Sequence, residues 1–235
     1  MPTATVEDYV KRLYVAQQRI AAARAATGDA SRDDPRGHAL VPVGALASAM
    51  GVVPGTATTM VKALADSGLV EYVPRLGVRL TRNGEQLALH VLRRHRLVEL
   101  FLVNVLRLDW SEVHAEAETL EHAISDKVLN AIDQALGFPL VDPHGDPIPS
   151  AKGTVAAVSN ATLVDCAVER RWRVRRVMDQ APAFLQFVER CGLRPGAAVR
   201  VLERDTAADS VTVIAEGKRP AILGWSAAAK IVVGA

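Results

Sequence analysis

The chain has 235 residues, of which 49% are hydrophobic, 4% are aromatic and 23% are charged. Since a single domain usually has ~100–200 residues, we expect two or three modules, and the few aromatics favour aliphatic, mainly helical cores. This composition excludes a disordered chain. The start has no basic segment followed by an apolar run, and no stretch of ~18 apolar residues occurs. These features argue against secretion and membrane insertion and favour the cytoplasm.

Charge is distributed unevenly along the chain. Residues 1–82 contain ten basic and seven acidic side chains, residues 83–150 contain five and eleven, and residues 151–235 contain thirteen and eight. Basic ends suit contact with phosphate, and an acidic centre suits a cation, although an ordinary solvated surface would explain much of the same pattern. The two cysteines, Cys166 and Cys191, have no zinc-finger spacing, and we expect both to be small buried residues.

The first predicted element is a helix from about Val6 to Arg24, because its apolar residues recur at helical spacing. Residues 25–39 contain Gly, Pro and Asp and are predicted to form a loop. A short helix lined by Leu46, Ala47 and Met50 then ends at Gly51, and Pro54 begins a second helix that runs to about Ser67. Two short helices around a glycine turn are typical of a helix-turn-helix.

A predicted β-hairpin follows these helices. Two alternating runs, Leu69 to Pro74 and Val78 to Thr81, flank the turn at residues 75–77. The hairpin completes the pattern of a winged helix-turn-helix, which is far more specific than any one of its parts.

The second of the two short helices is predicted to bind DNA. Its entry and outward positions have small side chains, which allow close approach to base edges and phosphates, and arginines of the wing could hold phosphates. Threonines are weak base readers, so thymine methyl contacts and DNA shape would carry much of the sequence preference. A winged helix used only for protein contacts is the alternative. The predicted DNA-binding residues are Pro54, Gly55, Thr56, Thr59, Arg75 and Arg79, with Arg82 as a further phosphate contact.

The acidic middle of the chain is predicted to form two amphipathic helices. The first, from about Asn83 to Val103, carries His95 and Glu99 four residues apart. The second, from about Trp110 to Leu136, has one face made of Val113, Ala117, Leu120, Ile124 and Val128. A polar stripe with i, i+4, i+7, i+8 spacing contains His114, Glu118, Glu121 and His122.

Imidazoles and carboxylates in one stripe are the ligands that a divalent transition ion needs. The absence of a thiolate favours manganese or ferrous iron over copper or a structural zinc, although the same ligands hold zinc or nickel more tightly by ordinary affinity order. A solvated, glutamate-rich helix face is the alternative interpretation of the stripe. The second His/Glu pair on the neighbouring helix favours a metal site.

Four stretches resemble the diphtheria toxin repressor family of iron- and manganese-dependent bacterial regulators. They are E-D-Y at Glu7 to Tyr9, R-R-H-R-L-V-E at Arg93 to Glu99, V-H-A-E-A-E-T-L-E-H at Val113 to His122, and D-P-H-G-D-P-I-P at Asp142 to Pro149. The resemblance covers residues 6–150 well and residues 160–235 more loosely. It implies an N-terminal winged helix-turn-helix domain over 1–82, a helical metal-binding and dimerisation domain over 83–150, and a linker with an SH3-like β-barrel over 151–235.

The resemblance also implies two metal sites. One would join the first helix to the dimerisation domain through Asp8, Glu118, Glu121 and His122, and the other would use His95, Glu99 and His114. The iron-dependent branch has a cysteine in place of Glu118 and a methionine in place of Asp8, so both residues here imply Mn²⁺, with Fe²⁺ as the alternative.

The chain departs from the family pattern at two places. Lys11 stands where compact manganese regulators carry a glutamate ligand, which leaves the number of metals open. Longer members add ligands from the third domain, where this chain offers Asp179 and Gln180 or Glu169.

The third segment follows the Pro/Gly-rich linker DPHGDPIPSAKG and has alternating apolar runs typical of a small β-barrel. Its charged runs around residues 169–176 are expected to be strand-edge and solvent charges, with contact to DNA or to the acidic middle as the alternative. A helix is expected at about Ala183 to Arg190. The expected strands are Trp172 to Val177, Ala198 to Leu202, Val211 to Ile214, Ala221 to Gly224 and Ile231 to Val233.

The sequence therefore predicts a non-enzymatic regulator in which metal fixes the spacing of two recognition helices on a palindromic double-stranded DNA operator. A homodimer is expected from this logic and from the apolar residues Leu97, Leu100, Phe101 and Val105, unless these form intramolecular core. A metal-dependent hydrolase is the rival from another class, but no motif such as HExxH marks it. A DNA-binding protein with a permanent structural metal is the third alternative.

Overall fold

The computed structural model describes residues 3–27, 39–156 and 161–235. They form two compact units, Met1–Arg93 with Ala151–Thr154, and Arg94–Ser150 with Val155–Ala235. The predicted loop at residues 25–39 lies mostly outside the described residues. No single helix in the described ranges is long and apolar enough to cross a membrane.

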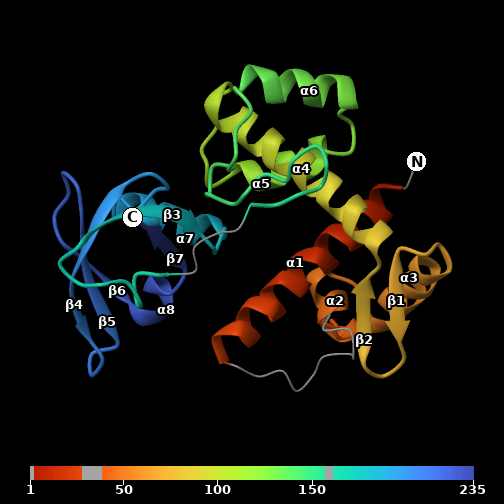
Figure 1. The fold of residues 1–235 in the computed structure, drawn as a ribbon, viewed down its shortest axis with the longest axis horizontal. Helices are drawn as coiled ribbons and strands as arrows, with labels where there is room; N and C mark the ends of the chain where they lie inside the picture. The colour runs from red at the N-terminus through yellow and green to blue at the C-terminus, as the bar shows by residue number, and fades with distance from the viewer. Residues whose placement is uncertain (1–2, 28–38, 157–160) are drawn as a thin grey trace. The chain divides into compact units, whose positions relative to one another are not determined.

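The first unit contains the predicted winged helix-turn-helix (Figure 1). Its helices are α1 (Ala4–Thr27), α2 (Val43–Ala49) and α3 (Pro54–Asp66), and its wing consists of strands β1 (Val70–Val73) and β2 (Gly77–Leu80). The chain bends by 106° between α2 and α3, which falls in the range for two helices of this motif. Gly51, with φ +65°, supplies the left-handed backbone that ends α2, and Pro54 occupies the first turn of α3.

An aliphatic core holds the winged helix in one arrangement. Val41 pairs with Val78 next to the wing, and a Cβ on Gly77 would lie 2.5 Å from the Val41 carbonyl oxygen. Gly77 also has φ +150°, so only glycine fits this close approach without strain. The buried core residues are Tyr9, Val10, Leu13, Val41, Leu46, Val61, Leu64, Val70, Val78 and Ala88.

Helix α4 (Arg82–Asn104) crosses the boundary between the units, and in the second unit α5 (Val113–Leu120) and α6 (Asp126–Ala135) pack on its C-terminal half. The prediction of one helix from Trp110 to Leu136 is wrong. The helix stops at Leu120, and Ser125 caps a new helix by accepting a hydrogen bond from the Val128 amide at 3.4 Å. Leu120 and Val128, which the prediction placed on the same face as Val113 and Ala117, are exposed.

The residues proposed for a dimer contact divide into two groups. Leu97 and Leu100 are buried against Leu129 and Ile132 of α6, and the partly buried Phe101 packs against the same cluster, so for these three the alternative of intramolecular core is correct. Val105 is exposed after the end of α4.

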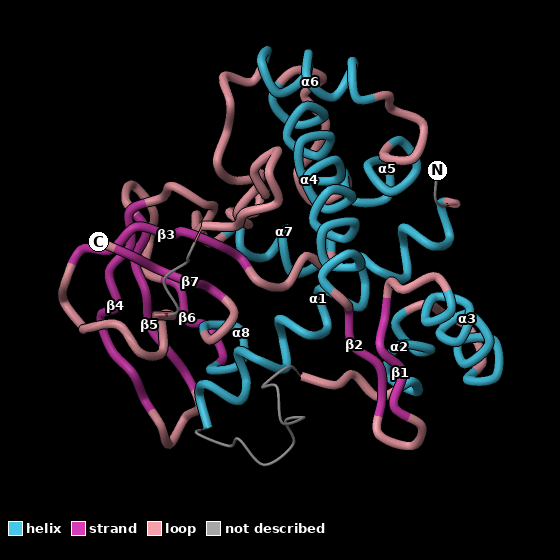
Figure 2. The backbone as a smooth tube through the Cα atoms, turned by 45° about the vertical axis from the view of Figure 1, so that its right-hand side comes forward, coloured by secondary structure: helices cyan, strands magenta, loops and turns pink. Residues whose placement is uncertain are grey.

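The C-terminal part of the second unit is an antiparallel five-stranded sheet with the order β6-β5-β4-β3-β7 (Figure 2). The small β-domain and its strands are confirmed, whereas the four-residue helix α8 was not expected. Cys166 is buried as predicted, but Cys191 is only partly buried. The elements are β3 (Arg171–Val177), α7 (Pro182–Arg190), β4 (Ala198–Asp205), β5 (Ser210–Ala215), β6 (Ala221–Gly224), α8 (Trp225–Ala228) and β7 (Ile231–Gly234).

The turn over residues 142–147 lies directly against β3. The Val177 amide donates a hydrogen bond to the His144 carbonyl at 2.9 Å, and Gln180 donates to Asp146 at 2.8 Å. Gly145 has φ +87°, and a Cβ at this position would lie 2.0 Å from the Arg175 carbonyl oxygen. The first half of the predicted linker is therefore packed against the C-terminal sheet within the second unit.

Candidate metal centre and nucleic-acid interface

The middle of the second unit brings two imidazoles and two carboxylates together. His95 and Glu99 come from adjacent turns of α4, and His114 and Glu118 come from α5. His95 Nε2 lies 3.0 Å from Glu99 Oε1 and 3.1 Å from His114 Nδ1, while Glu99 Oε1 lies 3.1 Å from His114 Nδ1. Glu118 Oε1 is 3.5 Å from His114 Nε2. One donor atom from each of His95, His114 and Glu118 lies within 4.8 Å of the other two, so nitrogen and hard oxygen donors are close enough together for a divalent metal.

Glu121 orients one of these imidazoles. Its Oε2 lies 2.6 Å from His95 Nδ1, and a proton on Nδ1 leaves the Nε2 lone pair directed at Glu99 and His114. Such a carboxylate behind a ligating histidine fixes the tautomer and raises the basicity of the ligand. The other oxygen of Glu121 lies 3.4 Å from His122 Nε2. Glu121 therefore contacts members of both predicted ligand sets.

Glu99 is 1% exposed, yet its surroundings favour the carboxylate form. Burial by itself raises the pKa of Glu99. When His95 also carries a proton on Nε2, its positive charge and the hydrogen bonds from His114 and His95 outweigh burial and lower the pKa of Glu99 below its ordinary value. Glu99 is thus available as an anionic oxygen ligand.

A second group that the sequence analysis did not assign lies on the other side of Glu99. Oxygen and nitrogen atoms of Glu99, Asp142 and His144 come within 4.8 Å of one another, and all three side chains are buried. His144 Nε2 donates to the Trp110 carbonyl at 2.9 Å, so its Nδ1 has a lone pair, which faces Glu99 Oε2 at 3.9 Å. Among the described residues, neither His144 Nδ1 nor Asp142 Oδ2 has a hydrogen-bond partner.

Burial, and then the negative charges of Asp146 and Glu99, raise the pKa of Asp142 well above its ordinary value. Arg96 opposes this effect, with its Nε 3.6 Å from Asp142 Oδ2 and its Nη2 3.7 Å from Asp146 Oδ1. The cluster thus has a cationic partner as well as the donor types of a divalent-metal site. The sequence feature that could have indicated this cluster is Asp142 and His144, an acid and a histidine two residues apart in a Pro/Gly turn.

The remaining predicted ligands belong to different elements of the chain. Asp8 lies in the second turn of α1, in the first unit, and His122 follows α5 in the second. The suggested third-domain ligands have other contacts: Asp179 pairs with Lys230 at 2.7 Å, Gln180 donates to Asp146, and Glu169 pairs with Arg200 at 3.4 Å.

The outward face of α3 agrees with the predicted interface. Pro54, Gly55, Thr56 and Thr59 are exposed, while Ala57, Val61 and Leu64 of the same helix are buried in the core. No side chain caps the start of α3, so the first-turn amides of Gly55 and Thr56 face outward at the positive end of the helix. Such an end suits a phosphate oxygen.

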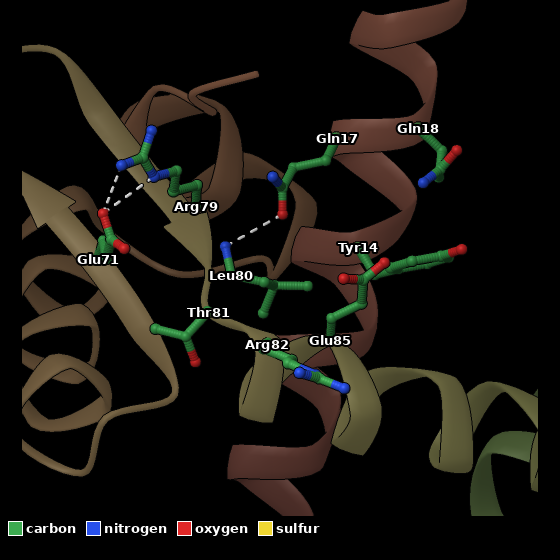
Figure 3. A pocket seen from close by; sticks show the side chains of 9 residues that line it. All are labelled: Tyr14, Gln17, Gln18, Glu71, Arg79, Leu80, Thr81, Arg82 and Glu85. Carbon is green, nitrogen blue, oxygen red and sulfur yellow. Dashed lines mark hydrogen bonds and ion pairs between the residues drawn. The ribbon is translucent and has the colours of Figure 1, made fainter. Parts of the chain in front are cut away.

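One of the two predicted wing arginines, Arg79, differs from the prediction. Arg75 is exposed at the tip, with φ +68°, but Arg79 is only 3% exposed. Figure 3 shows the Arg79 guanidinium turned toward Glu71 on the paired strand, and Arg79 Nε donates to Glu71 Oε2 at 3.1 Å. A buried, paired guanidinium is not available to DNA phosphate. Arg79 therefore joins β2 to β1 and does not belong to the DNA-binding residues.

A winged helix-turn-helix followed by a His/Glu cluster and a small β domain defines a metal-dependent DNA-binding regulator. Three family models match in the same order: "Iron dependent repressor, N-terminal DNA binding domain" over residues 34–78, "Iron dependent repressor, metal binding and dimerisation domain" over 81–150, and "FeoA domain" over 161–235. The chain belongs to the diphtheria toxin repressor family of iron-dependent repressors.

Among the relatives, the Diphtheria toxin repressor of Corynebacterium diphtheriae is 30% identical over 161 residues, which cover 64% of this chain and 71% of that protein. The Iron-dependent repressor IdeR of Mycobacterium leprae is 37% identical over 113 residues, which cover 46% of this chain. The match spans about half the length of that IdeR, 49%.

Among solved structures, a manganese-dependent transcriptional repressor in complex with manganese is 36% identical, with a TM-score of 0.79, and the match covers 97% of this chain and 98% of that one. The manganese regulator SloR is 30% identical, with a TM-score of 0.70 and 97% of each chain covered.

Proposed function

We propose that this protein is a manganese-responsive transcriptional regulator. In this proposal, a homodimer with bound Mn²⁺ binds a palindromic double-stranded DNA operator in the cytoplasm and represses genes for metal uptake. No catalytic role is assigned to the cluster, because the family is one of repressors.

The observation that carries the proposal is the donor set around Glu99. Two imidazoles and at least two carboxylates meet there, and no described thiolate is among them. Hard oxygen ligands with some nitrogen suit manganese and ferrous iron. The presence of Glu118 and Asp8, where the iron-dependent branch has cysteine and methionine, favours manganese. The names of two structural relatives also refer to manganese.

The proposed switch uses both predicted metal sites. An ion held by Asp8 of α1 and by Glu118, Glu121 and His122 would tie the DNA-binding domain to the dimerisation domain. Without metal, the clustered carboxylates repel one another, so the two domains would be freer to move. Binding of metal would then select the separation of recognition helices that fits successive major grooves.

An iron-responsive regulator is the second candidate, because the relatives in Mycobacterium leprae and Corynebacterium diphtheriae are named as an iron-dependent repressor and the diphtheria toxin repressor. The two candidates differ in which ion produces operator binding at a concentration near its cellular level.

The test is metal-resolved DNA binding by the full chain. An operator is selected from random duplexes in Mn²⁺, and its affinity is then measured at fixed salt in Mn²⁺, in anaerobic Fe²⁺ and after chelation. We expect tight binding that Mn²⁺ restores after chelation. Binding that is unaffected by removal and return of metal would support a permanent structural metal and contradict the proposal.

The variant His122→Ala tests the switch, with His90→Ala as a matched control. His122 follows α5 in the proposed bridging site, whereas His90 is an exposed imidazole on α4. Loss of a ligand should exceed the ~10–100-fold effect on metal affinity that is typical of orienting partners. Operator binding should therefore be weak with or without Mn²⁺ in His122→Ala and normal in His90→Ala. A full manganese response in His122→Ala would contradict the bridging site.

A further inference from the structure

The outward face of α3 carries methyl groups and hydroxyls and has a single basic side chain. Val53, at the entry to the helix, is 68% exposed, and Thr56, Thr59, Lys62 and Ala63 are exposed along the helix. Base preference on this face therefore depends on how each threonine presents its hydroxyl and its methyl group.

The hydroxyl proton of Thr59 is engaged in a hydrogen bond within α3. Thr59 Oγ1 donates a hydrogen bond to the Gly55 carbonyl at 3.1 Å, and Thr58 Oγ1 donates in the same way to Pro54 at 2.8 Å. A hydroxyl has one proton and two lone pairs. While this bond is kept, exposed Thr59 can offer a base only an acceptor oxygen and a methyl group.

A surface with an acceptor oxygen and a methyl group discriminates between base pairs by the groups that they present in the major groove. Guanine presents two acceptors, N7 and O6, which gain nothing from another acceptor, whereas adenine presents its N6 amino group and thymine its 5-methyl group. Cytosine offers an amino donor but no methyl group. An acceptor beside a methyl group therefore complements an A·T pair better than a G·C pair.

We propose that Thr59 is a specificity-determining residue that selects an A·T pair in the operator. Its hydroxyl oxygen accepts a hydrogen bond from the adenine N6 amino group, and its methyl group covers the thymine methyl. A guanine at the same place is rejected because its acceptors meet an acceptor. This inference rests on the proposed DNA-binding function and adds the chemistry of one contact to it.

The experiment compares operators selected from random duplexes in Mn²⁺ by the wild-type chain and by three variants. Thr59→Val keeps the shape and removes the acceptor, Thr59→Ser keeps the hydroxyl and removes the methyl group, and Thr59→Lys introduces a donor. Thr119→Val is the matched control, because exposed Thr119 on α5 makes the same bond to the Ala115 carbonyl at 3.1 Å. The base pair contacted by Thr59 is the one at which the Thr59 variants change their preference.

We expect A·T at that pair for the wild-type chain and for Thr119→Val, and guanine for Thr59→Lys. Replacing the thymine by uracil should weaken wild-type binding about fourfold, the effect of one buried methyl group, and leave Thr59→Ser nearly unchanged. Replacing the adenine by 2-aminopurine, which lacks the N6 amino group, should weaken the wild type and Thr59→Ser about threefold to tenfold and spare Thr59→Val.

The proposal is overturned if Mn²⁺-dependent operator binding is intact and all three Thr59 variants select the same bases as the wild-type chain. It is also overturned if the wild-type chain prefers guanine at the contacted pair. If the wild-type chain enriches no sequence in Mn²⁺, the proposed function itself fails, and that result is distinct because it does not involve the variants.

Discussion

The two wing arginines should respond to substitution in opposite ways. Arg75 is exposed, so Arg75→Ala should remove one phosphate contact and leave folding unchanged. Each neutralised phosphate contributes ~0.9 to the slope of log affinity against log salt, so the slope should fall by about 0.9 for each bound subunit. Arg79→Met should leave that slope unchanged, because the Arg79 guanidinium pairs with Glu71.

The cost of Arg79→Met should appear in stability instead. The pair has side chains that are 3% and 39% exposed, so it lies between a fully buried pair, where loss of one partner costs ~3–5 kcal/mol, and an exposed pair, worth ~0–1 kcal/mol. We expect the free energy of unfolding to fall by about 2 kcal/mol, which lowers the urea midpoint of the first unit by about 1 M. Operator binding across a salt series and urea unfolding measure the two effects. A reduced salt slope in Arg79→Met, with normal stability, would refute the assignment of Arg79 to the hairpin.

Three further outcomes follow from the site and the wing. The double variant Asp8→Met with Glu118→Cys should shift the metal response in operator binding from manganese toward ferrous iron, because softer ligands replace hard oxygens. An unchanged metal profile would show that these two residues do not determine metal selectivity. Glu121→Gln should weaken Mn²⁺ affinity by at least ~10–100-fold, measured by competition with a metallochromic chelator, because the replacement leaves His95 without its orienting carboxylate. Gly77→Ala should lower the thermal midpoint, since its Cβ would meet the Val41 carbonyl oxygen; a stability equal to that of the wild type would show that the wing is not held at this point.

The order of the elements could be predicted from the sequence because local signals coincide with the packing. Pro54, Gly51 and the alternating runs of the wing each mark a boundary that the structure keeps. The break between α5 and α6 was missed because apolar residues continue through it at helical spacing. The sequence signal for this break is Ser125 followed by Asp126. Ser125 can start a new helix there only when its hydroxyl accepts a hydrogen bond from a backbone amide, as it does from Val128.

The candidate ligands were predictable where they share one helix, as His95 and Glu99 do. His144 was not, because its approach to Glu99 depends on a turn some 45 residues away along the chain. The burial of Arg79 could not be predicted either, since the sequence of a four-residue strand does not show which of its faces packs inward. Tertiary contacts, and not local propensity, decided both positions.

The packing of the turn at residues 142–147 against β3 affects how the chain can be divided for experiments. The family model for the metal-binding domain ends at residue 150, but Gly145 fits under the backbone of Arg175, and the His144 carbonyl is held by the Val177 amide. A fragment ending at 150 would lose these restraints and would expose the indole of Trp110, whose Nε1 donates to Glu189 of α7 at 3.0 Å. Truncation at that boundary would therefore remove the support of Asp142 and His144 while leaving the contacts among His95, Glu99 and His114 within the fragment.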